Sequence, residues 1–221
     1  MGWIISWKRI PERHKKEKVL YKGVRVISII KRVVFMPQIN ASVNIENVVA
    51  SAVLKQRIDL NSVVKAFPNV EYRPEQFPGL VFRLKKPKTA TLIFNSGKMV
   101  CTGAKSERQA KKAVRKVVQE LKNNGILIVE KAEITVQNIV ASASLGGKID
   151  LEKSTVSLDR TMYEPEQFPG LIYRMNEPKV VILLFASGKL VCTGAKKEKE
   201  VYEAVNKLQG ILEDETLIYY E

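Results

Sequence analysis

The stretch Pro74-Glu75-Gln76-Phe77-Pro78-Gly79-Leu80 recurs unchanged, 91 residues later, as Pro165-Glu166-Gln167-Phe168-Pro169-Gly170-Leu171. Around it, residues 45–121 align with residues 136–212 without a gap, and 36 of the 77 positions are identical. This period is far longer than the roughly 20–50 residues of a solenoid repeat. It therefore predicts two like halves related by a pseudo-dyad. Such a molecule either meets a quasi-symmetric target or descends from a fused homodimer that has none, and the repeat alone leaves both open.

The two halves share one order of predicted elements. In the first half, apolar alternation and Pro or Gly breaks predict strands over residues 43–54, 70–73, 80–84, 89–95 and 98–102. A short helix is expected over 59–66. A long helix is expected after Ser106, with Gln109 placed for a capping box and Gly125 closing it as the C′ residue. The second half repeats this pattern through a helix over 199–212. The order β-α-β-β-β-β-α, twice, predicts an α+β fold with its helices on one face of a sheet.

The alternation of strand residues separates two faces of that sheet. One set consists of Val48, Ala50, Ile93 and Cys101, which we expect the helices to cover. The other set is largely apolar and uncharged: Asn47, Val49, Leu92, Phe94, Val100 and Thr102. An uncovered apolar face of this size would be a binding surface, unless a second layer of the chain covers it. Each half offers one long helix, which is enough for one face.

The composition favours a polyanionic partner. The chain has 221 residues, which suits one or two domains, and a formal net charge of +14. This balance points to nucleic acid first and to an acidic membrane surface second. A single histidine, His14, leaves no material for a His-based catalytic triad or a His-rich metal site. No apolar run of about 18 residues predicts a membrane helix, and Cys101 and Cys192, at equivalent positions, are expected to be buried structural thiols.

Residues 1–35 differ from the rest, with ten Lys or Arg and two Glu. Three readings stay open: a basic flexible arm, an added strand, or a stretch upstream of a start at Met36. The predicted organisation is therefore a basic extension over 1–42, a first repeat over 43–130, a second repeat over 131–215 and a tail over 216–221.

The duplicated E-Q-F-P-G-L and S-G-K-x-V-C-T-G-A-K blocks, at this spacing, resemble the TATA-binding protein family over about residues 43–212. Two nearly equal repeats and the second-half motif Glu-Pro-Glu-Gln-Phe-Pro-Gly are similar to the archaeal form. The resemblance implies a saddle: a curved ten-stranded antiparallel sheet with helices on its convex face and the minor groove of A·T-rich promoter DNA on its concave face. It implies a general transcription initiation factor, not an enzyme, that works in the cytoplasm at the nucleoid without a metal or cofactor.

The resemblance also gives roles to individual residues in both halves. Four aromatic side chains match the residues that intercalate between base pairs: Phe77, Phe94, Phe168 and Phe185. A second set matches the minor-groove contacts: Asn47, Val49, Leu92, Val100, Thr102, Asn138, Val140, Leu183, Val191 and Thr193. A third set matches the phosphate contacts: Arg83, Lys98, Lys105, Arg174, Lys189 and Lys196. An apolar floor tolerates A·T edges, whereas a G·C pair would bury its N2 amine without a partner.

The implied partners are double-stranded promoter DNA, transcription factor B and the RNA polymerase pre-initiation complex. Glu164 and Glu166 match the contact with transcription factor B, and the first half departs from them with Arg73 opposite Glu164. The resemblance implies a monomer on DNA, and the free protein could form a homodimer through its apolar face. Two alternatives remain: a nonspecific architectural nucleic-acid-binding protein with the same fold, and a pseudo-dimeric enzyme with a small-molecule site. The segment Gly97–Ser106 does not match the spacing of a phosphate-binding P-loop.

Overall fold

The computed structural model describes residues 19–21, 24–26 and 41–220. Contacts divide the chain into two units, residues 1–38 and 39–221. In the first unit, β1 (Val19–Tyr21) pairs antiparallel with β2 (Val24–Val26). Residues 1–18, 22–23 and 27–40 of the predicted N-terminal extension, including Met36, lie outside the described residues, so the three readings of this segment stay predictions. The last residue assigned to the extension, Ser42, begins β3.

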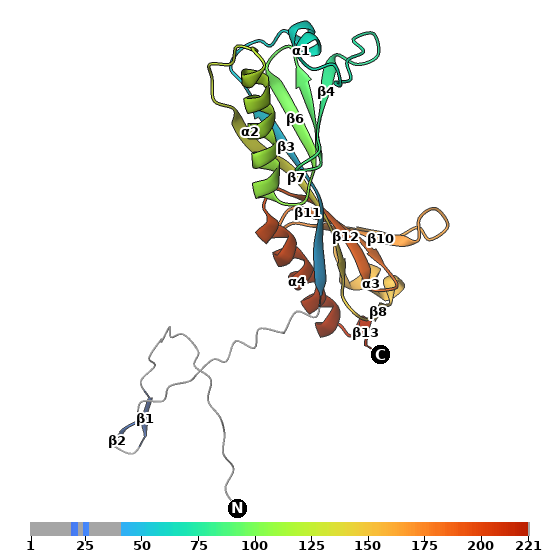
Figure 1. Ribbon diagram of the computed structural model, residues 1–221. Coiled ribbons are helices and arrows are strands. Elements are labelled where there is room, and N and C mark those ends of the chain that lie inside the picture. Colours follow the sequence, from blue (N-terminus) through green and yellow to red (C-terminus); the bar gives the residue numbers. More distant parts are fainter. Residues whose placement is uncertain (1–18, 22–23, 27–40, 221) are drawn as a thin grey trace, which may run out of the picture. The chain divides into compact units, whose positions relative to one another are not determined.

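Both repeats in the second unit keep the predicted order of elements (Figure 1), except that the first repeat lacks the strand predicted over 70–73 and the second repeat has two additional short strands, β8 and β13. The first contains β3 (Ser42–Val53), α1 (Leu60–Ala66), β4 (Gly79–Leu84), β5 (Thr89–Phe94), β6 (Lys98–Ala104) and α2 (Glu107–Asn123). The second contains β7 (Glu133–Ser144), β8 (Lys148–Ile149), α3 (Leu151–Ser157), β9 (Thr161–Met162), β10 (Gly170–Met175), β11 (Val180–Phe185), β12 (Lys189–Ala195), α4 (Glu198–Asp214) and β13 (Ile218–Tyr219). The C-terminal segment predicted as a tail pairs through β13 with β8.

One antiparallel sheet of nine strands runs through both repeats in the order β4-β5-β6-β3-β7-β12-β11-β10-β9. The sequence predicted ten. The tenth position is held by Glu71 alone, which forms an isolated bridge to Val81 through two backbone hydrogen bonds of 3.2 and 2.8 Å. Turns on both sides occupy the neighbouring backbone groups, because the Val70 N–H donates to the Phe67 carbonyl at 3.2 Å and the Arg73 carbonyl accepts from Gln76 and Phe77. The predicted strand over 70–73 therefore shrinks to one residue.

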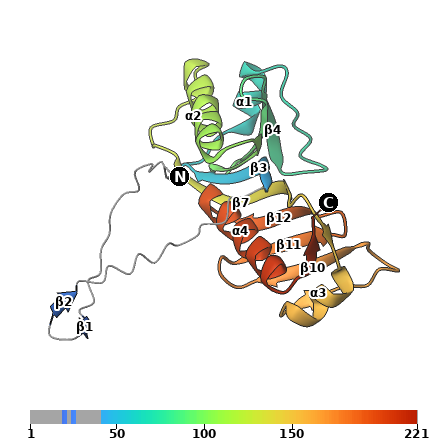
Figure 2. The same cartoon turned by 90° about the horizontal axis from the view of Figure 1, so that it is seen from below.

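The helices α2 and α4 lie on the same face of this sheet (Figures 1 and 2). Each buries one apolar stripe: Ala110, Ala113, Val114, Val117 and Leu121 in α2, and Val201, Ala204, Val205, Leu208 and Leu212 in α4. The core fills the space between these stripes and the sheet residues predicted to face them, all fully buried: Val48, Ala50, Ile93 and Cys101. The predicted single layer of helices is confirmed.

The ends of α2 show why the sequence stops and starts a helix there. The Ser106 side chain accepts a hydrogen bond from the Gln109 N–H at 3.0 Å, as predicted, but the Gln109 side chain returns to the N–H of Lys105, one residue before a standard capping box. At the other end Gly125 has φ +83°, and Ile126 donates to the Leu121 carbonyl at 3.0 Å. This is the glycine-closed C-terminus that the sequence predicted.

The strands β3 and β7 join the repeats, and each carries a bulge, at Glu46 and Gln137. Each bulged side chain crosses to a serine of the other strand. The Ser142 hydroxyl donates to Glu46 at 2.8 Å, and the Gln137 amide donates to Ser51 at 2.7 Å. Because bulges bend a strand and raise its twist, this pair curves the sheet at the pseudo-dyad.

The same pseudo-dyad relates the N-termini of α2 and α4. The N–H of Glu107 donates to the carboxylate of Glu198 at 2.7 Å, and the N–H of Glu198 donates to the carboxylate of Glu107 at 2.8 Å. Each acid thus satisfies a free N–H at the start of the other helix, where negative charge is also favoured by the helix dipole.

The two cysteine thiols are buried and unpaired with each other, as predicted. Burial raises the pKa of Cys192 to about 11, and burial also raises the pKa of Cys101. Both thiols therefore stay protonated and shielded at neutral pH.

We expect neither cysteine thiol to react with a thiol reagent in the native protein and both to react in denaturant, which a colorimetric thiol titration measures. Reaction of either thiol in the folded chain would contradict the buried placement.

Candidate nucleic-acid interface

The open face, defined as the face of the nine-stranded sheet opposite α2 and α4, has no second layer among the described residues. Its predicted apolar contacts are all partly exposed: Val49, Leu92, Val100, Val140, Leu183 and Val191. Strand register makes them contiguous, because Leu92 lies opposite both Val81 on β4 and Val100 on β6. The second repeat matches this with Leu183 between Ile172 and Val191. We call this contiguous apolar surface the floor. Val81 and Ile172 also belong to it, and the sequence analysis did not name them. Their pairing opposite Leu92 and Leu183 in neighbouring strands is the signal that would have identified them.

The four side chains predicted to intercalate between base pairs form two equivalent pairs on this face. Phe77 and Phe94 have ring centroids 5.8 Å apart at 65°, and Phe168 and Phe185 repeat this with 5.8 Å and 64°. These are edge-to-face contacts. All four rings remain partly exposed, and Phe77 is 40% exposed. The structure thus places the aromatic pairs outside the core.

A glycine beneath each pair allows the two rings to lie together. Gly79 is opposite Phe94 in the β4–β5 register, and a Cβ there would come within 2.6 Å of Phe77 and 3.0 Å of Phe94. Gly170 occupies the same position under the second pair. Sequence reasoning quoted both glycines in the repeated block but gave them no role. Only the close approach of both rings shows that a side chain at this position would displace the pair.

The two predicted asparagines are held in one orientation by the backbone. Asn47 accepts a 2.7 Å hydrogen bond on Oδ1 from the N–H of Gly103, and its Nδ2 lies 3.1 Å from the Thr102 hydroxyl. Asn138 repeats this with Gly194 at 2.7 Å. Because a backbone N–H can only donate, it fixes the oxygen end of each amide. The NH₂ group therefore keeps a donor for a ligand on the open face.

Gly103 and Gly194 are the bulge residues that supply these N–H groups. Their φ values are +93° and +102°, a region that L side chains rarely adopt. The β12–β7 register shifts between Thr193 and Ala195, on either side of Gly194. The glycine bulge therefore points an N–H at the asparagine instead of at the neighbouring strand.

The six predicted phosphate contacts are all exposed: Arg83, Lys98, Lys105, Arg174, Lys189 and Lys196. Alternation along β6 places Lys98 on the same face as Val100, and β12 does the same for Lys189 and Val191. Arg83 lies opposite Ala90, on the outer strand of the open face. The cations therefore surround an uncharged floor.

The two repeats differ in whether these cations are paired with acids. Arg83 donates to both Glu71 oxygens, at 3.0 and 3.4 Å, and Lys105 contacts Glu46 at 2.8 Å. Hydrogen bonds from Arg83 and its charge hold the pKa of Glu71 below its usual value. At the equivalent positions the second repeat has Met162 and Gln137, and Arg174 and Lys196 form no salt bridge with any described residue.

The predicted acidic contact residues, Glu164 and Glu166, are exposed in the turn that leads to Phe168. Backbone hydrogen bonds from Gln167 and Phe168 to the Glu164 carbonyl, both 2.9 Å, shape this turn. The loops before β4 and β10 project from the sheet on the side away from α2 and α4 (Figure 1). Both acids are therefore available to a partner at the end of the second repeat.

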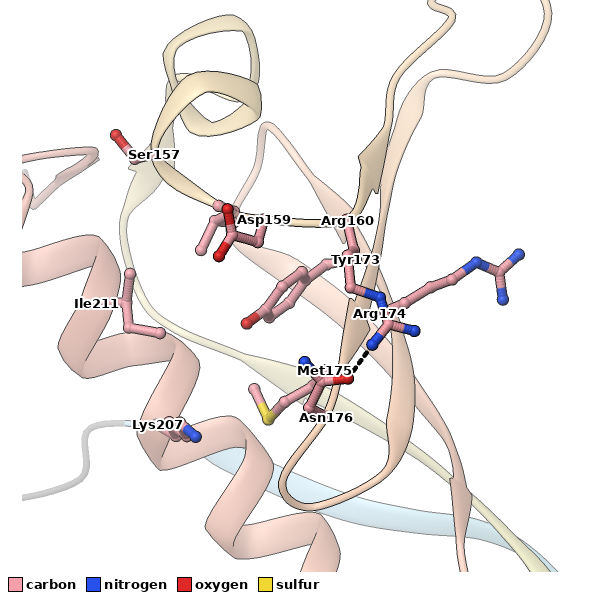
Figure 3. A pocket seen from close by; sticks show the side chains of 10 residues that line it. Ser157, Asp159, Arg160, Tyr173, Arg174, Met175, Asn176, Lys207 and Ile211 are labelled. Carbon is pink, nitrogen blue, oxygen red and sulfur yellow. Dashed lines mark hydrogen bonds between the residues drawn. The ribbon is translucent and has the colours of Figure 1, made fainter.

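A small cavity of about 180 Å³ lies outside the open face, between α3, β10 and α4. Figure 3 shows Tyr173, Asp159 and Lys207 around it. Burial raises the pKa of Tyr173, with a smaller contribution from Asp159. In the first repeat the edge-to-face pair Phe67–Phe82, with centroids 5.0 Å apart, occupies the equivalent position. Arg174 is the single predicted site residue in this lining.

The described residues contain no group of three or more His, Cys, Asp or Glu side chains placed to hold a metal ion. None of the helices seen in that part of the chain is both long and apolar enough to cross a membrane. The floor, the aromatic pairs and the surrounding cations are thus the features of the open face that remain to be explained.

Comparison with known proteins identifies the family. The family model described as transcription factor TFIID (or TATA-binding protein, TBP) matches residues 42–124 and 133–214. The chain belongs to the TATA-binding protein family.

Archaeal TATA-box-binding proteins are among its relatives. That of Pyrodictium occultum is 59% identical over 165 residues, covering 75% of this chain and 83% of the relative. That of Methanothermobacter thermautotrophicus is 52% identical over 179 residues, covering 81% and 99%. The solved structure of Methanococcus jannaschii TBP is 48% identical with a TM-score of 0.71, covering 78% of this chain and 99% of that one. The archaeal relatives confirm the predicted archaeal type, and the solved archaeal structure confirms the predicted saddle fold.

Arg83 is a predicted phosphate contact, so we expect its ion pair with Glu71 to weaken DNA binding by competing with phosphate. We expect Glu71→Met, which installs the second repeat's own residue, to raise affinity for duplex DNA. It should also steepen the salt dependence by about one counterion. Fluorescence anisotropy at several salt concentrations measures both. Met162→Glu is the matched control and should act oppositely through Arg174, so equal affinity of both variants would contradict the competition.

Proposed function

We propose that this member of the TATA-binding protein family is a general transcription initiation factor that binds the minor groove of A·T-rich promoter DNA as a monomer. It kinks the DNA by phenylalanine insertion and recruits transcription factor B and RNA polymerase. The observation that carries the proposal is the presence of two exposed aromatic pairs beside the uncharged floor of an uncovered sheet face. The name TATA-box-binding protein, borne by the archaeal relatives, supports the choice of DNA sequence.

The floor of the open face supports A·T preference through what it lacks. Val49, Leu92 and Val100 offer no acceptor for the N2 amine of a G·C pair, which would be buried without a hydrogen bond. Such a loss costs about 1–3 kcal/mol for each group. The Asn47 and Asn138 amides each donate one N–H to a threonine hydroxyl, at 3.1 and 3.2 Å, and their second N–H can donate to the N3 and O2 acceptors that A·T pairs present.

The aromatic pairs supply the wedge. An apolar ring can enter a base step without desolvating a charge, and unstacking a step costs a few kcal/mol that wider protein contact must offset. The pairs lie at equivalent positions in the two repeats, so they act on two separate steps. The exposed Arg and Lys residues around the floor position the backbone of the bent duplex without reading its sequence.

The decisive test compares wild type with Phe168→Ala/Phe185→Ala. We expect wild type to bind an A·T-rich promoter duplex selectively over a G·C-substituted one and to shorten its end-to-end distance in energy transfer. The double variant should lose the bend and at least about tenfold in affinity, since an aromatic–base stack contributes about 1–3 kcal/mol.

Phe67→Ala/Phe82→Ala is the contrast, because this aromatic pair lies away from the open face and should change stability more than bending. Equal, unbent binding of wild type to both duplexes would overturn the proposal in favour of the nonspecific architectural protein. Selective binding that survives in the Phe168/Phe185 variant would overturn the wedge alone.

The exposed acids at the end of the second repeat carry the proposed contact with transcription factor B. Glu164→Arg installs the charge that Arg73 has in the first repeat, on the same backbone turn. We expect Glu164→Arg/Glu166→Arg to weaken the ternary complex with DNA and transcription factor B by about tenfold through lost charge pairing. Binding to DNA alone should remain, as a gel-shift titration with and without transcription factor B measures. Unchanged recruitment would place the contact elsewhere.

A further inference from the structure

The cavity of about 180 Å³ between α3, β10 and α4 has no part in the proposed function. A cavity of about 150 Å³ accepts a molecule the size of benzene, so this one has room for a small solute. Its lining combines an apolar wall with several polar groups. The wall consists of Leu158, Met175 and Ile211, and the polar groups that the argument uses are those of Asp159, Arg160, Tyr173, Asn176 and Lys207.

The Tyr173 hydroxyl is the group that points to a ligand. Tyr173 is only 8% exposed, yet its hydroxyl forms no hydrogen bond with any described residue. Figure 3 shows it directed into the space between Asp159, Ile211 and Lys207. Burial raises the pKa of Tyr173, so the hydroxyl keeps its proton and can donate. Because buried polar groups are normally hydrogen-bonded, a molecule in the cavity is the partner that this hydroxyl lacks.

Two opposite charges lie at the cavity on either side of this hydroxyl (Figure 3). The Asp159 carboxylate forms no salt bridge with a residue that the structure describes. The Lys207 ammonium donates to the Glu177 carbonyl at 2.9 Å, which leaves two of its three N–H groups. The cavity therefore offers an acceptor for a cation at one end and donors for an anion at the other.

The turn that carries Asp159 into the lining has an unusual backbone. Arg160 has φ +59°, a region that a side chain of this size rarely adopts. Its guanidinium donates to the Asn176 side chain, and its carbonyl accepts from the Arg174 N–H at 3.2 Å, so both ends of the residue are held by β10 and its turn. Asn69, at the equivalent position of the first repeat, does not have a positive φ. Such local strain is typical of binding sites.

The first repeat has the same fold without the cavity's polar groups. There Phe67 and Phe82 occupy the positions of Leu158 and Tyr173, and their rings pack with centroids 5.0 Å apart. Pro68 stands where the second repeat has its acid. The smaller Leu158 leaves space and Tyr173 adds a hydroxyl to it, so the second repeat alone combines the volume with the charges.

We infer that this cavity binds a small zwitterion of the α-amino acid class with a short aliphatic side chain. Its ammonium group pairs with Asp159, and its carboxylate accepts from Lys207 and Tyr173. Its side chain packs against Met175 and Ile211. A solute with one charge leaves the opposite group of the cavity without a partner, and a large side chain exceeds the volume. Because the cavity is on the helix side of the sheet, the ligand leaves the open face available to DNA.

The test uses the full chain and isotope-labelled alanine in equilibrium dialysis. We expect saturable binding with a dissociation constant of about 1 mM. Propionate, which lacks the ammonium group of alanine, and ethylamine, which lacks its carboxylate, serve as matched competitors. Each should bind at least about tenfold more weakly, since each loses a hydrogen bond between charged groups.

Two variants locate the site. Leu158→Phe/Tyr173→Phe installs the first repeat's own aromatic pair, fills the cavity and should abolish alanine binding, while binding to duplex DNA reports that the chain still folds. Asp159→Asn should weaken alanine binding at least about tenfold. Asp214→Asn removes an acid of α4 outside the lining and should bind alanine as wild type does.

The inference is overturned if alanine shows no saturable binding to wild type, or if propionate or ethylamine competes as well as alanine itself. It is also overturned if Leu158→Phe/Tyr173→Phe retains wild-type binding, because the ligand is then elsewhere. Equal losses in Asp159→Asn and Asp214→Asn would reduce the effect to net charge and exclude the assigned pairing.

Discussion

The antiparallel pairing of β3 with β7 is the contact on which the rest of the structure depends. It extends from Ser42 opposite Ser144 to Val53 opposite Glu133 and joins the two repeats into one sheet. Without it each repeat would end at an unpaired central strand, an edge prone to pairing with other chains. Because the joined sheet has one long helix per repeat, one face is covered and the other is left continuous across the pseudo-dyad. The candidate interface therefore exists because the two long helices cover only one face of the sheet.

The bulges make that face usable, and they are the part of the fold that alternation could not predict. Ile45 packs against the core while Asn47 lies on the open face, although residues two apart in a regular strand share a face. The extra residue Glu46 absorbs the difference. Gly103 does the same in β6, where alternation alone would place it beside Cys101. A bulge depends on how two distant strands meet, so one strand's sequence cannot show it.

The features that the sequence predicted correctly are those that depend on local residue patterns or on the internal repeat. The helix stripes, the Gly125 terminus and the buried cysteines follow from periodicity and turn chemistry, and the repeat showed that both halves share one architecture. The roles of Gly79 and of the Asn47 side-chain oxygen could be recognised only from the structure. Gly79 lies against Phe94, and Asn47 accepts from Gly103, and both contacts join segments that are separated in sequence. The family resemblance supplied the site residues, and the structure supplied the reasons that their side chains point as they do.

The backbone is nearly symmetric while the charges are not, and this difference matters for a symmetric saddle. A molecule with two equal halves would bind a quasi-symmetric duplex equally well in both directions. Glu71 and Glu46 pair with Arg83 and Lys105 of the first repeat. In the second repeat Met162 and Gln137 stand at the positions of these two acids, so Arg174 and Lys196 lack the equivalent ion pair. On the helix side the contrast is between Lys112 and Glu203. These exposed substitutions therefore make the two repeats electrostatically different, although none of the side chains belongs to the buried core.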